Sequence, residues 1–208
     1  MYVPAAFAEH DRATLFDLME RHSFGLLISQ HQGEPFASHL PLLIDRRRGE
    51  NGFLVGHMAR ANPQWQQADG QVILAVFSGP HAYISPTWYE SENVVPTWNY
   101  AAVHVYGTFR AIHDEHAVAR IVEDTVRLYE ASMPTPWTVQ TGSEFNRRLI
   151  QAIVGFEIGI TRIEGKLKLN QNHPKERREK VIRALRSTGD PTSMSVARMM
   201  ADTLKDTP

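Results

Sequence analysis

Two short stretches of the sequence place residues that bind anions and flat rings at the predicted ends of strands. In the first, GHMARANPQW (residues 56–65), Arg60 lies between a predicted strand and Asn62, which with Pro63 forms a typical helix start. A guanidinium beside the free N–H groups of a helix N-terminus can hold one anion between them. The stretch therefore fits a phosphate site, although a surface arginine before a capped helix fits it equally well.

The second stretch, VVPTWNYAAVHVYG (residues 94–107), continues a run of large rings with polar edges: Tyr83, Trp88, Tyr89, Trp98 and Tyr100. Such rings line pockets for flat ligands, and a side chain such as Asn99 or Thr97 can fix the orientation of the ligand. A cluster in the core or at a subunit interface would use the same residues. Together, the two stretches indicate a phosphorylated planar cofactor.

Common catalytic and metal-binding patterns are missing. The sequence has no GxxxxGK[ST], GxGxxG, HExxH or GxSxG pattern. It has no cysteine, which excludes disulfides, thiolate metal sites and a cysteine nucleophile. Among the 10 histidines, His39, His57, His81 and His104 are scattered among predicted strands without paired spacing, and HDEH (residues 113–116) is better interpreted as a polar helix start. We interpret them as strand or surface side chains and expect no metal.

The segment KLKLNQNHPKERREKVIRALRS is strongly basic. Its basic residues outnumber Glu176 and Glu179; they are Lys166, Lys168, Lys175, Arg177, Arg178, Lys180, Arg183 and Arg186. A basic helix can contact phosphates, which makes DNA a partner to consider. The segment lacks interleaved aromatic residues and a helix-turn-helix pattern, so a solvated helix face is the preferred interpretation.

The totals describe a globular protein of ordinary composition. The chain has 208 residues, 42% of them hydrophobic, and a formal net charge of −1. This composition supports a full core and gives no overall attraction to nucleic acid or to anionic lipid. The N-terminus lacks a signal-peptide pattern, and no run approaches the roughly 18 apolar residues of a membrane helix. We expect a soluble cytoplasmic protein without membrane contact.

The elements that must position these residues are mostly strands joined by short turns. Strands are expected at 24–30, 36–45, 53–58, 71–79, 80–85, 98–113 and 153–170. Helices are expected at 11–22, 62–68, 114–132, 143–153, 175–187 and 193–204. Pro41 indicates an edge strand or a break, and Gly107 indicates a bulge. This pattern predicts an α+β fold with an antiparallel closed or split β-barrel and peripheral helices.

Successive blocks of the sequence resemble the PaiB family, described as FMN-binding negative transcriptional regulators. The blocks occur in order and without large gaps: MYVPAAF, ASHLPLL, GHMARANPQW, GPHAYISPTWY, VPTWNYAAVHVYG, AIVGFEI and GKLKLNQN. The departures are mild, since Asn170 stands where the family often has serine and Leu167 where it often has tryptophan. The resemblance runs from Met1 to about Arg186. We therefore expect one domain over residues 1–186, which includes the basic helix, and a helical extension over 187–208.

The resemblance implies a split β-barrel of the pyridoxamine-phosphate-oxidase type that binds FMN in clefts between the subunits of a homodimer. It places the phosphate at His57, Arg60 and Asn62, and the ring along the SHLPLL strand beside Pro41. Trp98, Asn99, Lys168 and Gln171 are expected to complete the site from the second subunit. The full set of expected cofactor-binding residues is His39, Leu40, Pro41, Leu42, His57, Met58, Ala59, Arg60, Asn62, Trp65, Trp98, Asn99, Lys168 and Gln171.

Three functions remain open from the sequence. The first is a dimeric FMN-binding regulator that responds to redox state or to a small ligand, with DNA as a further partner. The second is a flavin-dependent oxidoreductase of unknown substrate, because a fold does not determine a function. The third is a DNA-binding protein without flavin. No acid/base pair stands out, and a flavin can transfer hydride without one, so the sequence leaves enzymatic activity undecided.

Overall fold

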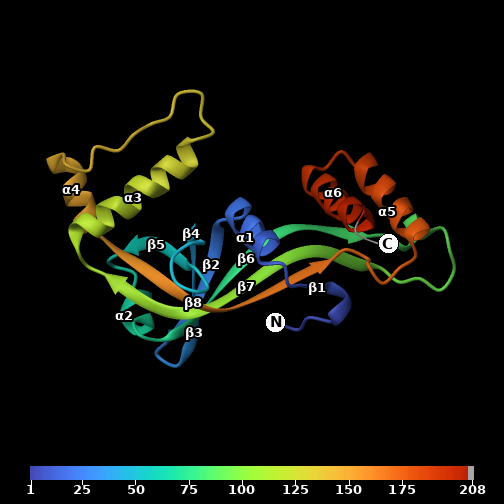
Figure 1. Ribbon diagram of the computed structural model, residues 1–208, viewed down its shortest axis with the longest axis horizontal. Coiled ribbons are helices and arrows are strands. Elements are labelled where there is room, and N and C mark those ends of the chain that lie inside the picture. Colours follow the sequence, from blue (N-terminus) through green and yellow to red (C-terminus); the bar gives the residue numbers. More distant parts are fainter. Residues whose placement is uncertain (206–208) are drawn as a thin grey trace. The chain divides into compact units, whose positions relative to one another are not determined.

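The computed structural model describes residues 1–205, which form two compact units (Figure 1). Unit 1 consists of Met1–Leu15, Ser78–Val103 and the described residues 164–205, and unit 2 of Phe16–Phe77 and His104–Ile163. Three long strands contribute residues to both units: β6 (Val72–Ile84), β7 (Thr97–Ile112) and β8 (Ile153–Lys168).

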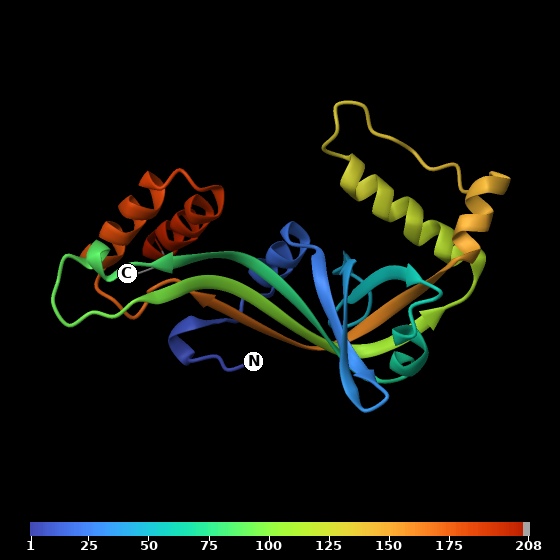
Figure 2. The ribbon, with the colours of Figure 1, turned by 180° about the vertical axis from the view of Figure 1, so that it is seen from behind.

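Unit 2 is built on a curled antiparallel sheet. Its further strands are β2 (Phe24–His31), β3 (Glu34–Pro41), β4 (Leu43–Asp45) and β5 (Phe53–Ala59), and the strand order is β3-β2-β6-β7-β8-β5-β4. The edge strands of a flat sheet of this kind would lie about 29 Å apart. Here Leu42 alone connects the two edge strands, β3 and β4, and one residue spans at most about 3.6 Å. The sheet must therefore curl until the end of β3 and the start of β4 come together at Leu42, as the predicted barrel requires. Figure 2 shows the β2–β3 hairpin at one edge.

Alternating burial along the strands produces the core of unit 2. Along the part of β7 in unit 2, buried positions alternate with partly exposed ones from His104 to Phe109, as expected for a strand with one face in a core. The rings of Phe109 and Phe156 stack with centroids 5.0 Å apart, and both side chains are fully buried. Burial of one such side chain stabilises a fold by about 1.5–3 kcal/mol, so these rings are principal contributors to the barrel core.

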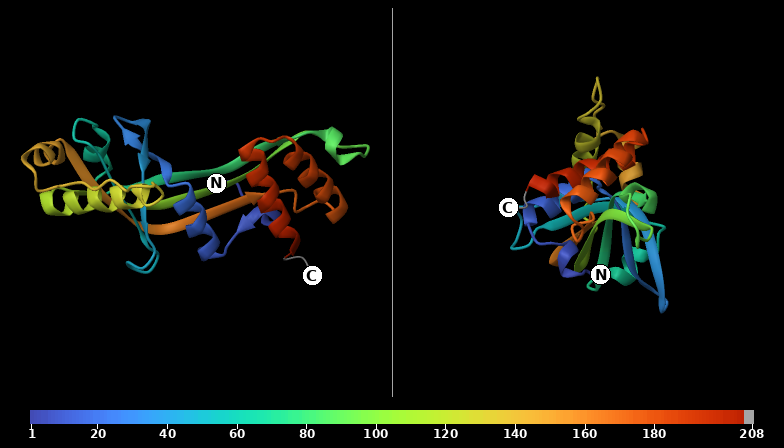
Figure 3. Two further views of the ribbon diagram at one scale, coloured as in Figure 1. Left: turned by 90° about the horizontal axis from the view of Figure 1, so that it is seen from above. Right: turned by 90° about the vertical axis from the view of Figure 1, so that its right-hand side faces the viewer.

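Helices surround the barrel strands. They are α1 (Arg12–Arg21), α2 (Gln64–Ala68), α3 (Glu115–Glu130) and α4 (Glu144–Gln151). Asp114 caps α3 by accepting from the Ala117 N–H, and Ser143 caps α4 by accepting from the Asn146 N–H. The loop of residues 131–143 joins α3 to α4 (Figure 3). We refer to α3, this loop and α4 together as the helical arm.

Unit 1 packs two C-terminal helices on the strands that it contains. These helices are α5 (Lys175–Ser187) and α6 (Pro191–Lys205), and they lie side by side (Figure 1). The short elements of the unit are η1 (Ala5–Phe7), β1 (Ala8–Glu9), which pairs with β8, and η2 (Pro86–Tyr89). The core contains Ala82, Ile84, Tyr89, Leu169, Val181, Ile182, Leu185, Val196, Ala197 and Met200. The expected extension 187–208 thus contributes α6 to this core; its residues 206–208 lie outside the described residues.

Several predicted elements differ from those observed. The strands expected at 71–79 and 80–85 form one continuous strand, β6, with Pro80 inside it. The strand expected at 36–45 is divided into β3 and β4 directly after Pro41. The short helix begins at Gln64 rather than Asn62. Gly107 is required by close approach, since a Cβ there would lie 2.5 Å from the Gly159 carbonyl oxygen.

Candidate functional site

Arg60 is held in place by the main chain at the junction of α4 and β8. Its Nε donates to the Gln151 carbonyl at 2.8 Å, and its Nη2 donates to the Ile153 carbonyl at 2.8 Å. The Arg60 N–H donates to the Ala152 carbonyl, also at 2.8 Å. Arginine has five N–H donors, so these contacts fix the guanidinium and leave Nη1 without a protein partner among the described residues. An exposed, positioned donor of this kind suits an anion.

Asn62 links the start of α2 to strand β3. Its Oδ1 accepts from the Gln64 N–H at 3.0 Å, and its Nδ2 donates to Ser38 Oγ at 2.9 Å. Trp65 closes the same turn, because its Nε1 donates to the Arg60 carbonyl at 3.1 Å. The structure therefore brings the two predicted segments, 38–42 and 57–65, side by side within unit 2.

Gln64, which the sequence did not single out, fixes α2 against the sheet. Its side chain is fully buried, and its Nε2 donates to the Leu27 carbonyl, Ser29 Oγ and the Phe36 carbonyl at 3.0–3.3 Å. The Nε2 group is satisfied in this way, whereas Oε1 has no hydrogen-bond partner among the described residues. No sequence signal marks this residue, because a polar side chain in a short helix usually lies at the surface.

His57 carries a buried nitrogen without a partner. Along β5, His57 is partly buried, Met58 lies in the core at 2% exposure, and Ala59 is exposed. Burial lowers the pKa of His57 below its usual 6.5, so the ring is neutral at neutral pH. Its Nδ1 has no hydrogen-bond partner within the described part of the chain. The Nδ1 atoms of His31 and His104 are orphaned in the same way, so this feature supports a ligand contact at His57 only together with the neighbouring Arg60. A polar group of a ligand would satisfy the His57 atom.

The end of β3 lies against β5. A Cβ on Gly56 would lie 3.1 Å from the Pro41 carbonyl oxygen. Leu42 is fully buried and donates its N–H to the Ser23 carbonyl at 2.8 Å, whereas Leu40 is half-buried and His39 is exposed with its ring stacked on Phe24. Because β3 ends the strand order, one row of its backbone groups lies outside the ladder. A flat polar ligand could pair with this row.

The expected site residues Trp98 and Asn99 belong to unit 1 and lie near the start of strand β7, directly after Thr97. Trp98 is 53% exposed, and its ring centroid lies 5.9 Å from that of Tyr83 and 6.1 Å from that of His81. Asn99 is fully buried, with its Nδ2 3.3 Å from Met200 Sδ. Successive strand residues face opposite sides, so Trp98 is accessible to a ligand and Asn99 faces α6.

Lys168 and Gln171 lie at the end of β8 in unit 1. Lys168 Nζ donates to Thr97 Oγ1. Gln171 Oε1 accepts from the Leu169 N–H at 2.7 Å, and its Nε2 donates to the Leu167 carbonyl at 2.5 Å. The amide of Gln171 thus shapes the turn, whereas Lys168 keeps donors for a further partner.

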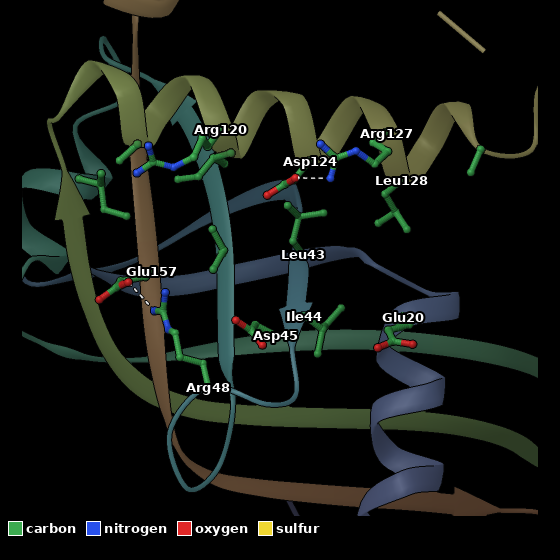
Figure 4. Close-up of a pocket in the computed structure, with 15 residues that line it drawn as sticks. Glu20, Leu43, Ile44, Asp45, Arg48, Arg120, Asp124, Arg127, Leu128 and Glu157 are labelled. Carbon is green, nitrogen blue, oxygen red and sulfur yellow. Dashed lines mark hydrogen bonds and ion pairs between the residues drawn. The ribbon is translucent and has the colours of Figure 1, made fainter. Parts of the chain in front are cut away.

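A groove that the sequence did not predict runs between α3 and strands β4, β5 and β8 in unit 2 (Figure 4). It encloses about 810 Å³, and Leu43, Val55 and Ile121 are among its apolar lining residues. Its charged side chains largely pair with one another: Arg48 with Glu157, and Arg127 with Asp124 at 2.8 Å. This pairing leaves little net charge for an ionic ligand.

Several residues of the basic C-terminal segment stabilise unit 1. Arg178 is only 5% exposed and donates to Thr203 Oγ1. Lys180 pairs with Glu90 at 3.0 Å, and Lys166 Nζ donates to the Tyr2 carbonyl at 3.1 Å. Arg183 and Arg186 are exposed. The segment therefore presents fewer free cations than its composition suggests.

Among residues 1–205, no three His, Cys, Asp or Glu side chains are grouped as a metal site would require. In the same range, no helix combines the length and the apolar character needed to cross a membrane.

A curled antiparallel sheet with an anchored arginine, an orphaned imidazole nitrogen and a free strand edge has the polar groups that a flavin phosphate and ring need. The fold is an antiparallel split β-barrel with peripheral helices, as predicted. The chain belongs to the PaiB family, since residues 1–162 match the family described as "Putative FMN-binding domain". FMN is accordingly its cofactor, and the predictions of family, fold class and cofactor are confirmed.

Known proteins resemble the chain in sequence and in fold. "Protease synthase and sporulation protein PAI 2" of Bacillus subtilis is 34% identical over 99% of both chains. The FAD- and heme-binding protein of Mycobacterium smegmatis superposes with a TM-score of 0.61 at 15% identity, covering 83% of this chain and 78% of the other. The flavocytochrome Anf3 of Azotobacter vinelandii superposes with a TM-score of 0.60 at 16% identity, covering 77% of this chain and 69% of the other. These two likenesses concern the fold alone.

Proposed function

We propose that the protein is a homodimeric FMN-binding regulator that responds to redox state or to a small ligand. The observation that carries this proposal is the pair of neighbouring exposed rings, Trp98 and Tyr83, 53% and 46% exposed. Large rings exposed together mark a surface that a ligand or another subunit covers. The relative from Bacillus subtilis, whose name includes sporulation, supports a regulatory role. A cytoplasmic location is part of the proposal, because a chain without cysteine suits a reducing compartment.

The helical arm supports the dimer. It exposes Met133 (50%), Trp137 (58%), Phe145 (71%) and Leu149 (53%). Apolar area removed from water stabilises an association by about 25 cal/mol per Å² before the costs of binding. If a second subunit covers these side chains, the apolar area buried at each of them stabilises the dimer.

Within this proposal, each subunit supplies two sets of contacts to FMN. Arg60 donates from Nη1 to the phosphate, and Asn62 fixes the turn that carries it. The backbone beside Pro41 and the orphaned Nδ1 of His57 meet polar groups of the cofactor. From the second subunit, Trp98 packs on the cofactor and Lys168 donates a hydrogen bond to it.

FMN supplies one- or two-electron transfer when it is bound. The protein holds the cofactor, excludes water from it and presents a neutral His57 beside it. A flavin-dependent oxidoreductase of unknown substrate remains the alternative, because the flavin can accept hydride without a protein acid or base. DNA is the less favoured partner, since Arg178 and Lys180 of α5 are already bonded within the protein.

Anaerobic reduction of the purified protein, followed by a screen of electron acceptors, tests this function. A regulator should bind its ligand or DNA with an affinity that differs between the oxidised and reduced forms, and it should show no multiple turnover. Sustained turnover with a reduced nicotinamide or another donor would contradict the regulatory proposal and favour the oxidoreductase. A colourless protein that does not bind added FMN would contradict both.

A further inference from the structure

A second pocket lies wholly within unit 1, where the end of β8 meets the start of α5. It encloses about 330 Å³, which is within the range of small-molecule sites. It is lined by Phe7, Tyr89, Asn93, Val94, Val95, Thr97, Lys168, Asn170, Asn172, His173 and Arg177. The lining contains two permanent cations and no carboxylate.

Both cations of this pocket have only neutral partners among the described residues. Lys168 Nζ donates to Thr97 Oγ1. Arg177 Nη1 lies 3.2 Å from His173 Nδ1, and its Nη2 donates to Ser91 Oγ at 3.1 Å. Lys180, on the same helix, pairs instead with Glu90 at 3.0 Å. Neither of the two charges that face the pocket therefore has a negative partner among the described residues, although partly buried cations are usually paired.

The walls of the pocket are ordered by contacts that do not use these charges. Asn170 Nδ2 donates to the Tyr89 hydroxyl at 3.1 Å, and the His173 ring lies 5.4 Å from the Tyr89 ring. Burial, and then the charge of Arg177, lower the pKa of His173, so its Nδ1 is free to accept from Arg177. Asn93 and Asn170 both adopt left-handed backbone conformations, with φ of 58° and 61°, which are uncommon away from glycine and cluster at ligand sites.

We propose that this pocket binds a small organic anion, with a carboxylate or phosphate held by Arg177 and Lys168 and a flat or apolar body against Phe7, Val94 and Val95. Charge-assisted hydrogen bonds to such a group are about twice as strong as neutral ones. That this anion is the ligand to which the protein responds rests on the proposed function, whereas the binding itself does not. Lys168 is also a predicted flavin contact, so Arg177 is the residue to vary.

Calorimetric titration of the FMN-loaded wild-type protein tests the charge requirement. The probes are benzoate, phenyl phosphate and neutral benzamide, which share a flat ring. Benzoate or phenyl phosphate should bind saturably and at least about tenfold more tightly than benzamide, and the tighter of the two identifies the anionic group. Equal affinities for benzamide and both anions, or no binding of either anion, would overturn the proposal. This comparison needs no variant and therefore does not depend on how a variant folds.

Arg177→Gln tests the position, with Arg183→Gln as its matched control. Both substitutions remove one positive charge from α5, but Arg183 does not line the pocket. Arg177→Gln should weaken the preferred anion at least about tenfold, and Arg183→Gln should leave it within about twofold. Equal losses in the two variants would overturn the proposal.

The absorbance of bound FMN, measured in the same samples, distinguishes this inference from the proposed function. The bound FMN of Arg177→Gln should match that of the wild type. If Arg177→Gln loses FMN together with the anion, the pocket belongs to the flavin site and the inference fails while the proposed function stands. If the wild-type protein binds the anion but never FMN, the proposed function fails and the pocket stands.

Discussion

At the scale of single residues, substitution of Arg60 tests the proposed phosphate site most directly. Arg60→Ala should lower FMN affinity about ten- to a hundredfold, because a charge-assisted hydrogen bond contributes about 1.5–3 kcal/mol. Riboflavin, which lacks the phosphate, should bind the wild type and the variant almost equally. Quenching of flavin fluorescence gives both affinities.

The matched control is Arg147→Ala, which removes an exposed arginine from the neighbouring helix α4. Arg60 also bonds to the Gln151 and Ile153 carbonyls, so a general loosening of the site would weaken FMN and riboflavin together. The ratio of the two affinities isolates the phosphate contribution. An unchanged ratio in Arg60→Ala would place the phosphate elsewhere.

The burial of His57 leads us to predict that the free energy of unfolding depends on pH. Burial holds its pKa below 6.5 in the folded protein. At a pH above the pKa that His57 has in the unfolded chain, the ring is neutral in both the folded and the unfolded state. When the pH falls below that pKa, the unfolded chain takes up the proton first, and the free energy of unfolding therefore decreases. His57→Gln should therefore lose less stability than the wild type between about pH 7.5 and about pH 5.5, as measured by urea unfolding.

The control for His57 is His116→Gln, an exposed position on α3. His22, His104 and His173 also have pKa values lowered by burial, so the wild type and both variants should all lose stability in acid. A decline in His57→Gln as steep as that of the wild type would contradict the burial that the structure gives His57.

At the scale of elements, the spacing of β7 and β8 requires a glycine at position 107. A Cβ there would meet the Gly159 carbonyl oxygen at 2.5 Å and Ile158 Cγ2 at 2.7 Å. Gly107→Ala should thus lower the free energy of unfolding by about 1–3 kcal/mol, the usual cost of overpacking. Chemical denaturation measures the change.

Gly142 is the matched control, because a Cβ there meets no described atom within 4 Å and its φ is not positive. Gly142→Ala should leave stability unchanged or raise it by up to about 1 kcal/mol. If Gly107→Ala were as harmless as Gly142→Ala, the close approach of β7 and β8 would be wrong.

Helix α5 gives a prediction about DNA. Each phosphate contact releases about one counterion, so binding through this helix would weaken steeply with salt. We expect weak binding or none in a filter or gel-shift assay, because Arg178 and Lys180 are already engaged. Tight, sequence-selective binding at physiological salt would contradict this expectation. It would do so most clearly if the dependence of affinity on salt concentration became weaker in the double variant Arg177→Gln, Arg183→Gln.

Helices and strands were predictable where a local sequence pattern determines them. Length predicted residues 98–113 as a strand, observed as β7 (Thr97–Ile112), and helical spacing predicted α3. Pro41 correctly marked the end of an edge strand. The division between the strands expected at 71–79 and 80–85 was wrong, because β6 runs through Pro80, and the sequence does not reveal which backbone N–H groups need a partner.

The site was predictable only in part, because contacts between distant residues decide the rest. The spacing of Arg60 and Asn62 identified a turn that the structure places beside Ser38. Nothing local indicates that Gln64 is buried, or that Asn99 faces Met200, 101 residues away in the chain. Side-chain burial of this kind depends on the packing of whole elements.

At the scale of the whole molecule, the family and the fold establish an FMN-binding protein. The exposed side chains Trp98, Tyr83, Trp137 and Phe145 lead to the further proposal that two chains share the cofactor. Without cysteine, no cysteinyl link to the flavin can form, and a link through one of the 10 histidines is the only covalent alternative considered. We predict that FMN is bound non-covalently. Acid precipitation should release all of the yellow colour into the supernatant.

The most direct test of this account is sedimentation of the purified protein, followed at the absorbance of the flavin and at that of the protein. Both signals should move together at twice the chain mass of 23.6 kDa, with one FMN for each chain. A flavin-loaded species that sediments at the mass of a single chain and stays loaded on dilution would contradict the shared site. So would a dimer whose flavin sediments separately from it.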